Sequence, residues 1–166
     1  MNKTVVLVVL AEDDPSDAKL TLAALAEHNV ANKVFHVSDG EQVLDYLNCE
    51  GRFKGREGGN PVAILLDLKM PKVDGLEVLK IIKADKNLQT IPVVVLTSSR
   101  EIPDLVECYR HGVNAYVVKP VEFDAFAKAV KQLGVFWAAV NEPPPEMGRE
   151  EFPLHDDEVM LVGKKG

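Results

Sequence analysis

The chain has 166 residues, of which 46% are hydrophobic and 27% are charged, as expected for one globular domain with a full-sized core. Its net charge of −7 repels a phosphate backbone, which argues against a DNA-binding protein. No apolar stretch approaches the roughly 20 residues that a bilayer span needs, and the N-terminus lacks a signal-peptide cleavage site, so we expect a cytoplasmic protein. Two separated cysteines and four scattered histidines give no zinc or redox motif.

Short apolar runs alternate with amphipathic segments five times, which is the pattern of βα units in a parallel sheet. The predicted strands are residues 5–10, 34–37, 62–66, 93–96 and 115–118. Asp14 and Pro15 supply an N-cap and an N1 proline for the first helix. Helical spacing predicts four amphipathic helices and a fifth from residue 122 to about 140. The apolar stripes of the first four are Ala18/Leu22/Leu25/Ala26, Gly40/Val43/Leu44/Leu47, Gly75/Val78/Leu79/Ile82 and Ile102/Leu105/Val106/Tyr109. The predicted fold class is α/β: a doubly wound, five-stranded parallel sheet, flavodoxin-like (βα)5, with strand order 2-1-3-4-5.

Two segments depart from this alternation. Residues 49–60 contain four glycines and three basic side chains, which predicts a long loop that is either solvated or in contact with a partner. Residues 141–166 contain three consecutive prolines and show no sustained period, so we expect an extended or disordered tail. The predicted organisation is therefore one domain over residues 3–140, followed by this tail.

Polar side chains follow four of the five predicted strands: Glu12 and Asp13 the first, Asp67 the third, Thr97 the fourth and Lys119 the fifth. Ligands of open α/β sheets bind beyond the carboxyl ends of the strands. Because the first and third strands are neighbours in the predicted order, Asp13 and Asp67 should reach a single ion, and hard oxygen donors favour Mg²⁺. The alternative for any one of these acids is that it only caps the following helix.

This set of groups limits the chemistry of the site. It offers a carboxylate nucleophile, a cation site, a hydroxyl and a lysine, but no histidine or cysteine base. Such a set suits transient phosphorylation of an aspartate, with Asp67 as the candidate nucleophile. Mg²⁺, Lys119 and the Thr97 hydroxyl would neutralise the oxygens of the transferring group.

At these positions the chain resembles the receiver domains of two-component response regulators, across about residues 3–140. The resemblance rests on Glu12-Asp13, on Leu-Leu-Asp-Leu-Lys-Met-Pro at 65–71 with Asp-Gly at 74–75, on Val-Val-Leu-Thr-Ser at 94–98 and on Tyr-Val-Val-Lys-Pro at 116–120. It implies that Asp67 is the phosphoacceptor, that Asp13 and Asp67 hold Mg²⁺ directly, that Glu12 acts through water, and that the backbone carbonyl of Lys69 completes the protein ligands.

The resemblance also implies a conformational switch. The phosphoryl group draws the Thr97 hydroxyl inward, the ring of Tyr116 fills the vacated space, and Lys119 pairs with a phosphoryl oxygen. For Tyr116 the alternative is simple packing in an edge strand. The Lys119-Pro120 bond is expected to be cis. Lys69 and Ser99 are positions whose side chains affect how fast the aspartyl phosphate hydrolyses.

The opening Pro15-x-Asp17, the glycine-rich loop and the aromatic end of the last helix are similar to stand-alone regulators that pair with phytochrome-type histidine kinases. This implies a phosphoryl donor that is a sensor histidine kinase or a histidine phosphotransfer protein. It also implies a homodimer through the fourth helix, fifth strand and fifth helix, with Phe136 and Trp137 either in that interface or packed under the tail. The protein would be a phosphoacceptor that signals, with slow self-dephosphorylation as its only further reaction.

Three alternatives use the same fold. A pseudo-receiver would dock partners without being phosphorylated. An aspartyl-nucleophile phosphatase would need an Asp-x-Asp pattern, which Lys69 breaks. A flavodoxin-like cofactor binder would need a phosphate cradle, whereas the first loop is acidic.

Overall fold

Parallel pairing organises the sheet. The computed structural model describes residues 7–27, 33–56, 59–144 and 160–161. Its strands are β1 (Leu7–Ala11), β2 (Lys33–Val37), β3 (Ala63–Leu66), β4 (Val93–Thr97), β5 (Ala115–Val118) and β6 (Met160–Leu161), in the spatial order β5-β4-β3-β1-β2-β6. The pairs among β1 to β5 are all parallel, which confirms the predicted five-stranded arrangement with order 2-1-3-4-5.

The two-residue strand β6 is an addition that the sequence did not predict. It pairs antiparallel with the outer edge of β2, where Val34 lies opposite Met160. The segment predicted as an extended or disordered tail therefore contributes one short strand to the sheet. Residues 145–159 and 162–166 of that segment lie outside the described residues, as do Val5 and Val6 of the first predicted strand.

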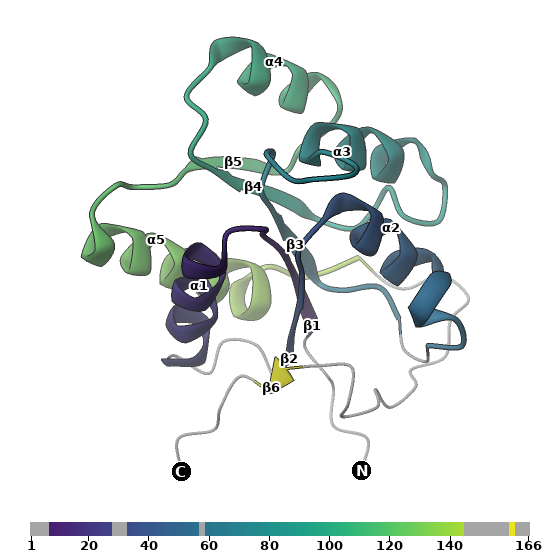
Figure 1. Cartoon of the computed structure of the whole chain (residues 1–166), viewed down its shortest axis with the longest axis horizontal. Helices are drawn as coiled ribbons and strands as arrows, with labels where there is room; N and C mark the ends of the chain where they lie inside the picture. The colour runs from purple at the N-terminus through teal and green to yellow at the C-terminus, as the bar shows by residue number, and fades with distance from the viewer. Residues whose placement is uncertain (1–6, 28–32, 57–58, 145–159, 162–166) are drawn as a thin grey trace.

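Helices cover both faces of the sheet, as Figure 1 shows. They are α1 (Pro15–Glu27), α2 (Gly40–Asn48), α3 (Gly75–Ala84), α4 (Ile102–Arg110) and α5 (Phe123–Val135), with a 3₁₀ turn η1 (Gly51–Phe53) and a π-helical turn η2 (Phe136–Val140). The alternation of side chains along β1 separates two cores. Val9 packs in the core with α2, α3 and α4, whereas Leu10 packs in the core with α1 and α5. None of the helices in the described part of the chain is long and apolar enough to cross a bilayer.

Aspartates cap α1 and α3, which begin at the carboxyl edge of the sheet. Asp14 accepts a hydrogen bond from the Asp17 N–H at 2.9 Å, which confirms its predicted role as N-cap of α1. Asp74 caps α3 in the same way through the Glu77 N–H at 2.9 Å.

The loop between β3 and α3 packs closely against the first residues of α2 and α3. A Cβ on Gly40 would lie 1.9 Å from the carbonyl oxygen of Val73, and a Cβ on Gly75 would lie 2.1 Å from the carbonyl oxygen of Asp67. Only glycine permits backbone contacts this close. Within the loop, Lys72 has a positive φ of 66° and its ammonium lies 3.7 Å from a carboxylate oxygen of Asp39, the N-cap of α2.

The apolar stripe of α4 is exposed. The helix forms as expected, but its apolar stripe lies on the surface, with Ile102 70% and Tyr109 57% exposed, while Cys108 is the buried side chain of this helix. Periodicity locates an apolar face without saying what covers it. The α4 face, which we define as Ile102, Leu105, Val106 and Tyr109, is consequently open to solvent.

The loop predicted over residues 49–60 is folded back onto the protein. Phe53 is buried, with its ring centroid 5.2 Å from that of Tyr46, and the Arg56 guanidinium stacks over the Tyr46 ring at 4.0 Å. Arg56 also donates to the carbonyl oxygen of Tyr46 at 3.0 Å. Glu50, Gly51, Arg52, Lys54 and Gly55 are exposed, so the loop is anchored at Phe53 and Arg56 and solvated between them, and its contact with a partner stays a prediction. Residues 57 and 58 lie outside the described residues.

Candidate functional site

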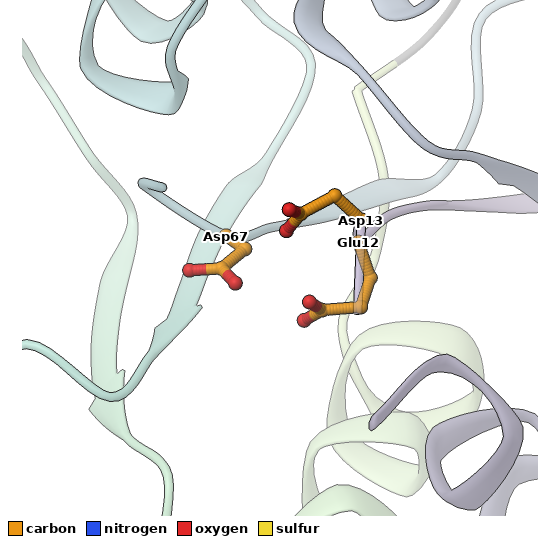
Figure 2. Close-up of side chains that lie close together, drawn as sticks. All are labelled: Glu12, Asp13 and Asp67. Atoms are coloured by element: carbon orange, nitrogen blue, oxygen red, sulfur yellow. The ribbon is translucent and has the colours of Figure 1, made fainter. Parts of the chain in front are cut away.

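Three carboxylates gather at the carboxyl ends of two neighbouring strands, as Figure 2 shows. Glu12 and Asp13 directly follow β1, and Asp67 directly follows β3. One carboxylate oxygen from each lies within 4.8 Å of the others. Glu12 and Asp67 are buried, whereas Asp13 is exposed. Parallel pairing of β1 with β3 therefore brings together the acids that the sequence predicted to share one ion.

Lys119 extends from the end of β5 into this acidic group. Its Nζ lies 2.5 Å from Glu12 Oε2, 3.1 Å from Asp67 Oδ2 and 3.0 Å from Asp17 Oδ2. The backbone N–H of Lys119 donates to the carbonyl oxygen of Thr97 at 2.7 Å, which fixes where the side chain starts. The predicted convergence of Lys119 with the acids is thus present in the structure, and Asp17 is an additional partner.

The electrostatics of the site favour a further cation. Burial raises the pKa of Glu12 to about 7, against the lowering effect of its hydrogen bond with Lys119, and the negative charge of Asp67 adds to the rise. Burial by itself lowers the pKa of Lys119, but its bonds to Glu12 and Asp17 outweigh burial and raise that pKa. One ammonium thus faces several carboxylates. Oxygen donors at this spacing, with an excess of negative charge, fit a hard divalent cation.

Thr97 and Tyr116 both hydrogen-bond the backbone of Ser99. Thr97 is fully buried at the end of β4, and its Oγ1 accepts from the Ser99 N–H at 3.3 Å. The Tyr116 hydroxyl donates to the carbonyl oxygen of Ser99 at 3.1 Å, while its ring packs against the core on the α3 and α4 side. Burial raises the pKa of Tyr116. A change at Thr97 can therefore reach Tyr116 through one residue.

The side chain of Ser99 connects the same point to α4. Its hydroxyl donates to Asp104 in the first turn of α4 at 2.5 Å and accepts from the Glu101 N–H at 3.3 Å. Sequence reasoning singled out Ser99 for its position beside the site and missed this link. A sequence pattern could have indicated this bond: a serine that follows a strand, and an acid in the first turn of the next helix.

Two further expectations concern the neighbours of Asp67 and Lys119. The Lys69 N–H donates to Asp67 Oδ1 at 3.4 Å, and the metal-binding role of the Lys69 carbonyl stays a prediction. The expected cis bond between Lys119 and Pro120 is wrong, because the described residues contain no cis peptide bond. The trans form is the intrinsically preferred one for X-Pro, and Lys119 reaches its three carboxylates with it.

Comparison with known proteins identifies the family: the chain belongs to the response regulator receiver domains, whose family model matches residues 8–131. Among curated proteins, it is 37% identical to the probable methanogenesis regulatory protein FilR2 of Methanothrix harundinacea, over 83% of this chain and 87% of that protein. It is 34% identical to the response regulator Rcp1 of Synechocystis, over 79% of this chain and 88% of Rcp1.

Solved structures of response regulators are similar to this chain in both fold and sequence. The phosphorylated cyanobacterial phytochrome response regulator RcpA superposes with a TM-score of 0.80 at 37% identity, covering 86% of this chain and 100% of RcpA. The Mn²⁺-bound form of Rcp1 gives a TM-score of 0.79 at 32% identity, covering 84% and 99%. The bacteriophytochrome response regulator RtBRR is 56% identical, with a TM-score of 0.69 and 86% of each chain covered. The protein is thus a receiver-domain response regulator.

Proposed function

We propose that Asp67 accepts a phosphoryl group from a phosphohistidine of a sensor histidine kinase or of a histidine phosphotransfer protein. The observation that carries this proposal is the approach of the Lys119 ammonium to 3.1 Å from Asp67 within the acidic group of a receiver domain. In the transfer, the N–P bond of the phosphohistidine breaks, a bond forms between phosphorus and a carboxylate oxygen of Asp67, and the departing imidazole retains the electron pair. Lys119 then donates a hydrogen bond to a phosphoryl oxygen.

Asp13 and Asp67 would hold Mg²⁺ directly, with Glu12 acting through water and the Lys69 carbonyl completing the protein ligands. The spacing of the three carboxylates and the Mn²⁺-bound form of Rcp1 support a divalent cation here. When bound, Mg²⁺ supplies positive charge to the oxygens of the transferring group. Ionised Glu12 also offsets the positive charge of Lys119, so that the lysine is held beside Asp67 before a phosphoryl group arrives.

The phosphorylated state would be communicated through Thr97, Ser99 and Tyr116. Movement of the Thr97 hydroxyl toward a phosphoryl oxygen, to which it would donate, would draw Oγ1 away from the Ser99 N–H from which it now accepts. Ser99 in turn bonds Tyr116 and the first turn of α4, so the loop before α4 would shift. A phosphoryl group moves such an equilibrium only by its different contacts in the two states.

The exposed α4 face is the surface that a partner or a second copy would read. We assign a homodimer contact to α4, β5 and α5, supported by the apolar side chains of the α4 face and by Phe136, which is 47% exposed. Trp137 instead packs partly against the core beside α1 and α5. The similarity to RcpA and RtBRR supports a phytochrome-type kinase as the phosphoryl donor.

The test is intact mass after incubation with phosphoramidate, with and without Mg²⁺. The parent protein should gain one base-labile phosphoryl group only when Mg²⁺ is present, and Asp67→Asn should gain none. Asp124→Asn is a matched control, because Asp124 is an exposed acid in the first turn of α5. Phosphorylation of another residue in Asp67→Asn would overturn the assignment. Failure of the parent both to gain the group and to bind beryllofluoride would favour a docking domain that works without phosphorylation.

A further inference from the structure

Asp17 joins the phosphorylation site from a different element than the other acids. It lies in the first turn of α1, where its N–H donates to Asp14 at 2.9 Å and its carbonyl oxygen accepts from the Thr21 hydroxyl at 2.8 Å. These bonds fix its backbone. Its carboxylate then reaches across to Lys119 Nζ at 3.0 Å, a contact between residues 102 positions apart.

Asp17 lies outside the group of acids that could hold a metal ion. Within the described part of the chain, that group consists of Glu12, Asp13 and Asp67. Asp17 and Lys119 together line an open hollow of about 390 Å³ between α1 and the start of α5, and none of those three acids lines it. Asp17 therefore contacts Lys119 on the side that faces this hollow. Its carboxylate can be removed by mutation without removing a candidate metal ligand.

The hydrogen-bonding capacity of Lys119 is fully used. An ammonium group has three N–H donors, and the described residues offer Nζ three carboxylate acceptors. A phosphoryl group on Asp67 would add up to three strong acceptor oxygens and, because the carboxylate charge is consumed, about one further negative charge. Asp17 would compete with these oxygens for Lys119, and its negative charge would repel them.

We propose that Asp17 is a positioning residue that holds Lys119 in the unphosphorylated state and thereby opposes loading of the site with a phosphoryl group. This inference rests on the proposed function of Asp67. The acid works through Lys119 and touches neither the phosphoryl group nor the metal ion. It gives this chain a means of setting how strongly the site retains a phosphoryl group, separate from the residues that carry out the transfer.

The test measures the affinity of the full chain for beryllofluoride, which mimics a phosphoryl group on an aspartate. Isothermal titration is carried out at saturating Mg²⁺ for the parent, Asp17→Asn and the control Asp124→Asn. Asp17→Asn should bind beryllofluoride tighter by roughly fivefold to tenfold, the size of one partly exposed charge-assisted hydrogen bond, and the control should match the parent. A merely structural role of Asp17 would weaken binding or leave it unchanged.

Each result separates the inference from the proposed function. Equal or weaker binding by Asp17→Asn, with normal binding by the parent, overturns the role of Asp17 and leaves Asp67 as phosphoacceptor. No binding by the parent overturns the proposed function itself. Asp17→Ser also removes the carboxylate and keeps a hydroxyl suited to the first turn of a helix, so it must shift the affinity in the same direction as Asp17→Asn. Circular dichroism melts establish that both variants are folded.

Discussion

Glu12 makes the stability of the metal-free protein depend on pH. Burial raises its pKa from 4.5 to about 7. Between these values the folded protein keeps a proton on Glu12 that the unfolded chain has lost, so the free energy of unfolding falls as the pH rises through this window. The difference corresponds to about 3 kcal/mol, because one pKa unit is worth about 1.4 kcal/mol. Lys119 adds no slope here, since its raised pKa keeps it charged in both states.

Urea denaturation in EDTA at pH 5 and pH 8 measures this effect. Between the two pH values the parent should lose roughly 2 to 3 kcal/mol more stability than Glu12→Gln, which has no proton to exchange. Glu77→Gln removes an exposed carboxylate on α3 and should behave like the parent. An equal fall in the free energy of unfolding for the parent and Glu12→Gln would refute the raised pKa of Glu12 as the cause of the pH dependence.

Saturating Mg²⁺ extends the same experiment to the metal site. A divalent cation stabilises the ionised form of a nearby carboxylate. With Mg²⁺ present, the extra loss in free energy of unfolding that the parent shows at pH 8 relative to Glu12→Gln should therefore be smaller. An unchanged difference would contradict binding of the cation beside Glu12.

The remaining predictions concern Gly75, Ser99 and the α4 face. Gly75→Ala should lower the free energy of unfolding by about 3 kcal/mol or more in urea denaturation, because its Cβ would lie 2.1 Å from the Asp67 carbonyl oxygen. Ser99→Ala should cost about 1 kcal/mol and speed amide exchange in the first turn of α4, because the bond to Asp104 is lost. Ile102→Glu should change stability by less than about 0.5 kcal/mol, since this side chain is 70% exposed, yet weaken dimerisation in sedimentation velocity with beryllofluoride bound.

Each of these variants has a result that counts against its explanation. Unchanged stability of Gly75→Ala would mean that the β3–α3 loop can move away from the helix. Unchanged amide exchange in Ser99→Ala would mean that the hydroxyl does not hold α4. Unchanged sedimentation of Ile102→Glu would contradict the proposed dimer contact at the α4 face.

The strands were predictable because burial on both faces leaves a continuous apolar run. Residues 93–96 were predicted almost to their end, and the observed strand Val93–Thr97 is buried along its whole length. Residues 115–118 were predicted to their ends although the edge strand Ala115–Val118 is only half-buried. β6 was not predicted, because two residues carry no period and its pairing with β2 depends on tertiary contact. The spacing of the α4 stripe is the same for a buried face and for an exposed one, so the spacing alone did not predict its exposure.

The candidate site followed from strand order, which places Asp13, Asp67 and Lys119 at one edge of the sheet. Asp17 was noticed in sequence only as part of an opening motif. Its contact with Lys119 depends on where α1 lies relative to the start of α5, which no local pattern encodes. The same holds for Ser99, whose four hydrogen bonds join three separate elements.

The two loops beside Asp67 differ in stiffness. The β3–α3 loop packs against the backbone at Gly40 and Gly75, and this close packing leaves the loop little room to move. The β4–α4 loop is tied by the hydrogen bonds of Ser99, each of which can exchange its partner. If Asp67 is phosphorylated as proposed, the added charge would displace the β4–α4 loop more readily than the β3–α3 loop, so the conformational change would reach α4.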